Sequence, residues 1–356
     1  MKLICVAYIL LSAAAAAKAS PILENRNVGN NFESVNKKGD WNLVPDSDGK
    51  MHLVDISNVD VDAEPLFDPL ADINFRLFTR QNPSAGQLIV IHNNAQLAAS
   101  NFNPALPTRF MIHGWNGGGA NSGGGMARAW LDQIECNAFG VDWGAGARTL
   151  NYILARSRVN VTGHVVGEYI QFLQRNGLSL SNVVVAGHSL GAHVAGFAGK
   201  RVRQLTGAPI HAVVALDPAG PLFSLDDPAN RFDSTDATYV ESIVTDGGRL
   251  GFEHPVGHAN FYPNWGTTQP GCPPNDFTGQ CSHSIVSTFF GASFNSSHIF
   301  GATRCRDLND IRNRNCVQSG PSRRMGGEPV MDGVSPVGSV FFLETYPDPP
   351  FAQGPR

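Results

Sequence analysis

The sequence is poor in charged residues and has no excess of positive charge. Asp, Glu, Lys and Arg make up 16% of its 356 residues, and the formal net charge is −4 at pH 7. Proteins that bind nucleic acid usually carry a basic patch, so this balance argues against a nucleic-acid partner. The sequence also has no internal repeat. Its length instead indicates a globular chain that buries a substantial core.

Long apolar runs are missing beyond the N-terminus. The first residues combine Lys2, an apolar run from Leu3 to Ala17 and a small-residue site at Ala17-Lys18-Ala19. This pattern is typical of a signal peptide, and the run is too short for a comfortable membrane span. We therefore expect residues 1–19 to be a signal peptide and the protein to be secreted, extracellular and without a transmembrane segment.

Cysteines are few, and one of the six lies in the predicted signal peptide. Secretion favours disulfide bonds, but spacing alone does not establish their connectivity. The local candidate pairs are Cys272 with Cys281 and Cys305 with Cys316, and Cys136 is left over. Two sequons, at Asn160 and Asn295, would make the secreted chain a glycoprotein.

The middle of the chain alternates between strand-like and helical patterns. Residues 20–70 look irregular, whereas later segments predict an early hairpin (73–79 and 87–91), strands over 109–112, 139–143, 183–186 and 211–216, and a helix over 161–176. Alternation of this kind indicates an α/β fold with a mainly parallel sheet covered on both faces. Ligands bind such sheets beyond the carboxyl ends of the strands, where Trp115, Asp142, Ser189 and Asp217 are expected.

The stretch VVVAGHSLGAH, residues 183–193, carries the strongest chemical signal. Three valines predict a buried strand, and Gly187 and Gly191 leave room for a very tight turn. The small residues that follow predict a thin helix. This G-x-S-x-G arrangement holds a serine hydroxyl at a sharp strand-to-helix turn, so Ser189 is the predicted nucleophile.

A serine nucleophile needs a carboxylate to orient its base. Asp217 is the clearest candidate, because it ends an apolar strand and precedes Pro218. The other candidates are Asp226, Asp227, Asp233, Asp236 and Asp246.

The base is expected after the acid, because G-x-S-x-G hydrolases run Ser, acid, His along the chain. Four histidines follow Asp217: His254, His258, His283 and His298. His283 directly follows Cys281-Ser282, where a disulfide could fix its loop, and His258 is the main rival. Chemistry alone leaves these two open. His188 and His193 lie too close to Ser189 in sequence to take its proton.

An oxyanion hole usually combines two backbone N–H groups. One belongs to the residue after the nucleophile, here Leu190. The other comes from the loop after an earlier strand, where Trp115 precedes a glycine-rich stretch.

Several motifs together resemble the pancreatic-lipase family of secreted α/β-hydrolases, and insect lipases and wasp venom phospholipases in particular. They are GHSLGAHVAG, LDPAGP, IHGW, VDWGAGA, PVGHANFYPN and QPGC…CSHS, within about residues 70–320. The resemblance implies the α/β-hydrolase fold, with Ser189 as nucleophile, Asp217 as acid and His283 as base in place of His258. It also implies Trp115 and Leu190 as oxyanion donors, and no cofactor.

The chain departs from the triglyceride-selective members of that family in two respects. The resemblance implies a bond between Cys272 and Cys281 that clamps the lid, yet only PPNDFTGQ lies between them. So short a lid resembles the phospholipase A1 branch. The chain is also expected to be a single catalytic domain over 20–356 without a C-terminal β-sandwich, and hence without a colipase partner. The Arg231–Asp236 loop resembles a structural calcium loop, but acidic turns are common, so no metal is assigned and calcium at this loop is left open.

The sequence therefore predicts a secreted lipase, a carboxylic-ester hydrolase that releases fatty acids from glycerolipids through an acyl-enzyme. Its expected partners are its lipid substrate and, transiently, lipid aggregates or a membrane surface. The first alternative is a phospholipase A1 that acts on phosphoglycerides. The second is a non-catalytic lipid binder similar to insect yolk proteins, which the presence of Ser189, Asp217 and His283 disfavours.

Overall fold

A computed structural model describes residues 41–45, 50–55, 67–149, 151–330 and 335–356. The predicted signal peptide over residues 1–19 lies outside this range. No helix in the described part of the chain has the length and apolar character that crossing a bilayer requires.

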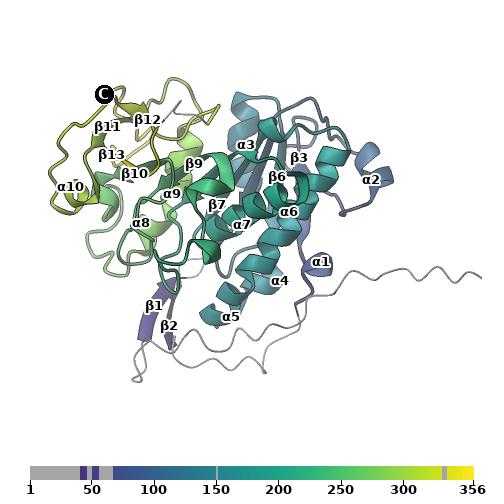
Figure 1. Cartoon of the computed structure of the whole chain (residues 1–356), viewed down its shortest axis with the longest axis horizontal. Helices are drawn as coiled ribbons and strands as arrows, with labels where there is room; N and C mark the ends of the chain where they lie inside the picture. Colours follow the sequence, from purple (N-terminus) through teal and green to yellow (C-terminus); the bar gives the residue numbers. More distant parts are fainter. Residues whose placement is uncertain (1–40, 46–49, 56–66, 150, 331–334) are drawn as a thin grey trace, which may run out of the picture. The chain divides into compact units, whose positions relative to one another are not determined.

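The described residues form an eleven-stranded sheet in the order β12-β11-β13-β10-β9-β8-β7-β5-β6-β3-β4 (Figure 1). The strands are β3 Asn74–Phe78, β4 Gln87–Leu88, β5 Thr108–Ile112, β6 Asn137–Asp142, β7 Val183–His188, β8 Ile210–Leu216, β9 Ala237–Ile243, β10 Ala259–Pro263, β11 Gly301–Cys305, β12 Arg323–Arg324 and β13 Ser339–Leu343. The run from β6 to β13 through β5, β7, β8, β9 and β10 is parallel, and both outer ends are antiparallel. The mainly parallel α/β sheet predicted from the sequence is therefore confirmed.

Helices lie between and beside these strands. The α-helices are α1 Pro69–Asp72, α2 Asn94–Ala98, α3 Gly124–Gln133, α4 Gly144–Ala147, α5 Tyr152–Ser157, α6 Val159–Arg175, α7 Leu190–Thr206, α8 Gln280–Ser284, α9 Val286–Ala292 and α10 Leu308–Arg312. Short 3₁₀ turns are η1 Leu180–Asn182, η2 Pro228–Asn230, η3 Ser234–Asp236 and η4 Asn264–Gly266.

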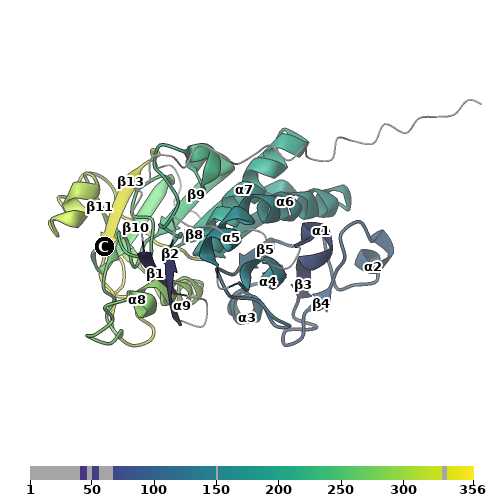
Figure 2. The same ribbon diagram turned by 90° about the horizontal axis from the view of Figure 1, so that it is seen from below.

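Both faces of the sheet are buried. Successive residues of a strand point to opposite faces, and β7 follows this rule: Val183 and Val185 belong to one apolar cluster, whereas Val184 and Ala186 belong to the other. Figure 2 shows α6 and α7 on one side of the sheet and α3 and α9 on the other. This two-sided cover explains why the predicted strand is a continuous valine run.

The helix after the nucleophile is thin because it packs closely on α6. A Cβ atom at Gly163 of α6 would lie 2.3 Å from Cβ of Phe197 on α7. On the other side of α7, a Cβ atom at Gly199 would lie 2.1 Å from the Asp236 carbonyl oxygen. Glycine at these positions therefore lets α7 approach its neighbours, as the small-residue pattern predicted.

One segment differs from the prediction. Residues 20–70 were expected to be irregular, but β1 Trp41–Pro45 and β2 Met51–Asp55 form an antiparallel pair within it. Each strand has only five residues. In so short a segment, alternation between buried and exposed side chains is too weak to distinguish a strand from a loop.

Candidate active site

Ser189 occupies the turn between β7 and α7 in a strained backbone conformation. Its φ and ψ are 57° and −122°, and its N–H donates to the Leu216 carbonyl at 3.1 Å. A Cβ atom at Gly187 would lie 2.0 Å from the Gly191 carbonyl oxygen, and one at Gly191 would lie 2.4 Å from the Ile112 carbonyl oxygen, so the turn excludes side chains at both positions. A non-glycine residue in such a conformation costs on the order of 1–3 kcal/mol, which the surrounding packing must offset.

Asp217 and His283 are hydrogen-bonded to each other. Oδ2 of Asp217 lies 2.5 Å from Nδ1 of His283, and both side chains are buried. Since a carboxylate only accepts, Nδ1 carries the proton and Nε2 is left as the basic nitrogen. The bond therefore selects the tautomer that a general base requires.

The loop after β9 holds the Asp217 carboxylate in place. Oδ1 of Asp217 accepts hydrogen bonds from the backbone N–H groups of Thr245 at 2.7 Å and Asp246 at 2.9 Å. A Cβ atom at Gly251 would lie 2.7 Å from the same oxygen, so only glycine leaves room for it there. With His283 on Oδ2, these bonds hold both oxygens of the carboxylate in place.

His188 brings the predicted nucleophile and base together. Its Nε2 donates to the His283 carbonyl at 2.9 Å, and the two rings lie 4.6 Å apart between centroids. Burial, with smaller effects from neighbouring His283 and His113, lowers the pKa of His188 to about 3, so this ring stays neutral. The hydrogen bonds described for Ser189 and His283 include none between the Ser189 hydroxyl and the His283 ring. Such bonds are often long before substrate binds.

The short loop before α8 is bonded to the helix that carries His283. Cys272 and Cys281 form a disulfide, as the resemblance implied, and Cys305 and Cys316 form a second one. Within the loop, the Asp276 carboxylate accepts from the N–H of Cys281 at 3.2 Å and the N–H of Ser282 at 3.0 Å. This carboxylate thus satisfies two free N–H groups in the first turn of α8, and the second of them belongs to Ser282, the residue before His283.

Arg249 connects this loop to the acid side of the site. Its guanidinium forms an ion pair with Asp246, and it also donates to the Asp276 carbonyl at 3.1 Å. Burial and the nearby Asp217 carboxylate raise the pKa of Asp246, and Arg249 opposes that shift. A chain of contacts thus runs from Asp217 through Asp246, Arg249 and Asp276 to α8, the helix that carries His283. No sequence pattern pointed to Arg249 or Asp276.

The two predicted oxyanion donors come from segments that touch. Leu190 is the first residue of α7, so its N–H has no acceptor one turn earlier in the helix. A Cβ atom at Gly114, just before Trp115, would lie 2.8 Å from Cβ of Ser189. The Trp115 indole is buried and donates to the Thr149 carbonyl at 2.8 Å. The loop that carries Trp115 therefore packs directly against the nucleophile turn.

The other predicted histidines have different environments. His258 directly precedes β10, and its Nδ1 accepts from the Val240 N–H at 3.0 Å, in the middle of β9. His193 is buried against Phe223, with Nε2 donating to the Ala219 carbonyl at 2.9 Å and Nδ1 accepting from the Phe232 N–H. Neither ring is placed to act on Ser189.

The Arg231–Asp236 loop does not fit calcium. The Asp236 carboxylate pairs with the Lys200 ammonium, and Asp233 pairs with the Arg231 guanidinium at 2.9 Å. These cations take the oxygens that a metal would need. Among the described residues, the one cluster of three potential metal ligands contains Cys272 and Cys281, whose sulfurs are bonded to each other.

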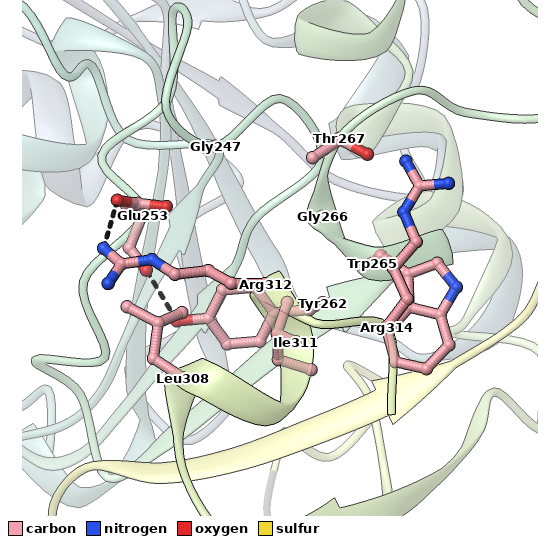
Figure 3. Close-up of a pocket in the computed structure, with 10 residues that line it drawn as sticks. All are labelled: Gly247, Glu253, Tyr262, Trp265, Gly266, Thr267, Leu308, Ile311, Arg312 and Arg314. Carbon is pink, nitrogen blue, oxygen red and sulfur yellow. Dashed lines mark hydrogen bonds and ion pairs between the residues drawn. The ribbon is translucent and has the colours of Figure 1, made fainter. Parts of the chain in front are cut away.

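A small cavity of about 130 Å³ lies between the β9–β10 region and α10 (Figure 3). Arg312 pairs with the Glu253 carboxylate at 2.5 Å, and the Tyr262 hydroxyl donates to the Glu253 carbonyl at 2.7 Å. Neither Ser189, Asp217 nor His283 lines this cavity. Three of its lining residues, Glu253, Tyr262 and Arg312, are thus bonded to one another.

A serine on a strained strand-to-helix turn, beside an Asp–His pair at the carboxyl edge of a mainly parallel sheet, defines an α/β-hydrolase. The Lipase family model matches residues 48–351. The chain therefore belongs to the Lipase family.

Two relatives illustrate this membership. The chain is 33% identical over 300 residues to lipase member H of Mus musculus, an alignment that covers 77% of this chain and 63% of the relative. It is 34% identical to pancreatic triacylglycerol lipase of Myocastor coypus, over 71% of this chain and 59% of the relative. The chain thus spans less than two thirds of the length of these relatives.

Solved structures of two esterases match part of this chain. An esterase/lipase from an uncultured bacterium is 13% identical with a TM-score of 0.31, and the match covers 52% of this chain and 73% of the esterase chain. A phospholipase/carboxylesterase from Dyadobacter fermentans is 15% identical with a TM-score of 0.31, over 43% of this chain and 74% of its own.

Proposed function

We propose that this protein is a secreted lipase, a serine carboxylic-ester hydrolase that releases fatty acids from glycerolipids. The observation that carries the proposal is the combination of Ser189 on its strained turn with the 2.5 Å bond between Asp217 and His283. Membership of the Lipase family supports the same chemistry.

The reaction proceeds in two halves. His283 Nε2 takes the proton from the Ser189 hydroxyl as its oxygen attacks the ester carbonyl, and the N–H groups of Trp115 and Leu190 stabilise the oxyanion. Asp217 holds the Nδ1 proton and stabilises the charged ring. His283 then protonates the leaving alcohol. Water hydrolyses the acyl-enzyme by the same steps in reverse and frees the fatty acid.

The lid loop bears on the class of substrate. Only residues 273–280 lie between Cys272 and Cys281, and the Phe277 side chain among them is 84% exposed. So short a loop leaves room for bulky headgroups, which favours phospholipase A1 activity as the alternative. The likeness to a pancreatic triacylglycerol lipase supports neutral glycerides. Parallel hydrolysis of triacylglycerol, diacylglycerol and phosphatidylcholine separates these two specificities.

The proposed extracellular location has two supports. The Cys272–Cys281 and Cys305–Cys316 disulfides persist in an oxidising compartment. The pattern of residues 1–19 is that of a secretory leader. Detection of the processed chain in the medium of expressing cells tests this location.

A fluorophosphonate probe tests the chemistry. Such probes react covalently with an activated serine, so we expect one labelled site, located at Ser189 by peptide mapping. The matched control is His283→Ala, which should label far more slowly because the hydroxyl loses its base. A wild-type protein that resists the probe would favour the non-catalytic lipid binder.

A further inference from the structure

The hairpin of β1 and β2 has one buried and one exposed apolar face. Val44 and Val54 belong to the main apolar core cluster. On the opposite face, Trp41, Leu43 and Leu53 are 59%, 52% and 60% exposed, although they are large apolar residues. Leu43 and Leu53 are direct cross-strand partners, so their side chains lie together. A clustered exposed patch of this kind marks an interaction surface.

The buried face of the hairpin contacts the loop of the predicted oxyanion hole. The His52 ring lies 5.0 Å from the Trp115 indole in an edge-to-face arrangement. Gly114, the neighbour of Trp115, packs against Ser189, so one layer of residues separates the hairpin from the nucleophile turn. Both ribbon views show the hairpin beside α8, the helix that carries His283 (Figures 1 and 2).

A second exposed apolar side chain lies on the loop before α8. Phe277 is the most exposed of the large apolar residues described, and its loop is bonded to α8 through Asp276. Exposed apolar side chains therefore lie on two segments that contact the site: the hairpin, which packs on the Trp115 loop, and the Phe277 loop, which is bonded to α8.

We propose that Trp41, Leu43 and Leu53 form a docking face that inserts into a lipid–water interface and holds the site against it. The purpose of this face rests on the proposed lipase function, because its substrate collects at such interfaces. The hairpin packs on the loop of Trp115, so a lipid surface on this face would hold the substrate close to the nucleophile turn. Trp and Leu side chains suit the headgroup–acyl boundary.

Vesicle binding tests this docking face without requiring catalysis. The full chain with Ser189→Ala is mixed with phosphatidylcholine vesicles, and its bound fraction is measured by sedimentation. Phosphatidylcholine is chosen because its headgroup carries no net charge, so that binding reports the apolar face. Adding Leu43→Ser and Leu53→Ser should weaken partitioning by about tenfold or more.

A matched pair provides the control. Leu88 and Val90 are 39% and 49% exposed, at the far edge of the sheet, so Leu88→Ser with Val90→Ser should change partitioning less than about twofold. With Ser189 intact, both double variants should hydrolyse a dissolved short-chain ester at the wild-type rate, which shows that each has folded.

Two results would overturn the inference. One is vesicle binding that the Leu43→Ser, Leu53→Ser variant leaves unchanged, or that the Leu88→Ser, Val90→Ser control lowers by the same factor. The other is self-association without vesicles that the hairpin variant abolishes, which would assign the face to a second copy of the chain. Vesicle binding through the hairpin by a protein that resists the fluorophosphonate probe would refute the lipase function and leave the docking face standing.

Discussion

Asp217 and His283 are 66 residues apart in sequence, yet Oδ2 of one lies 2.5 Å from Nδ1 of the other. Each residue is fixed from its own side. Asp217 is held by two N–H groups of the loop after β9, and His283 by a helix that Asp276 caps. Changes to this pair should therefore lower kcat, whereas changes elsewhere in the fold should lower mainly the free energy of unfolding.

The first prediction separates the two candidate bases. His283→Ala should lower kcat by roughly 10⁴-fold or more, because the general base and its link to Asp217 are both lost. His258→Ala is the control, since its ring accepts from the Val240 N–H in the middle of β9 and its loss should affect mainly stability. Steady-state kinetics on a dissolved ester measure both. A larger loss of kcat in His258→Ala would contradict the assignment.

Arg249 is expected to act as a positioning residue. Arg249→Met removes its bonds to Asp246 and Asp276 and should lower kcat by about tenfold with KM little changed, because small displacements of reacting groups are costly. Arg249→Lys should recover part of the loss. Arg128→Met breaks an exposed ion pair with Asp132 and should leave kcat within about twofold. Equal effects of the Arg249 and Arg128 variants on kcat would refute the positioning role.

His193 provides a pH-dependent prediction. Burial lowers its pKa to about 3, so below the unfolded pKa of about 6.5 the unfolded chain binds a proton that the folded chain excludes. The native state therefore loses stability as the pH falls through this window. For His193 alone the loss should reach ~2–3 kcal/mol near pH 4.5.

The comparison with His193→Gln isolates this effect from other titrating groups. Gln lacks the titration, so the stability advantage of the wild type over this variant should shrink as the pH falls from about 7 to about 4.5. Urea unfolding at the two pH values measures the difference. A gap that stays constant with pH would mean that His193 is protonated in the folded protein.

The short loop between Cys272 and Cys281 predicts little interfacial activation. A disulfide closes the loop at its base, and Arg249 and Asp276 bond it to its surroundings, so it has little freedom to swing over Ser189. The rate on a short-chain ester should therefore rise smoothly through the solubility limit. A steep increase at that limit would mean that another segment covers the site.

The parts of the fold that the sequence predicts share a physical reason. A strand buried on both faces, such as Val183–His188, has a run of β-branched residues in its sequence. The positions on either side of Ser189 require glycine, because any Cβ atom there would lie near 2 Å from a backbone atom. Local patterns of this kind are visible in a single sequence. They also predicted a helix over 161–176, which matches α6 closely, and a helix after Ser189, where α7 begins.

Other features depend on contacts between distant segments and could not be predicted in this way. Arg249 and Asp276 resemble ordinary loop residues, and their roles appear only when the two loops meet. The β1–β2 pair was missed because five-residue strands carry little pattern. The choice of His283 over His258 came from a family resemblance, and no local chemistry separates the two.

The most direct test of the central claim compares wild type with Ser189→Ala on a dissolved short-chain ester. Both proteins are purified as full chains, and their unfolding transitions are compared first, because the serine hydroxyl is not part of the core. We expect the variant to remain folded and to lose at least about 10⁴-fold in kcat, retaining only the rate that binding and the oxyanion donors supply. Hydrolysis by the folded variant at a rate near that of the wild type would contradict this claim.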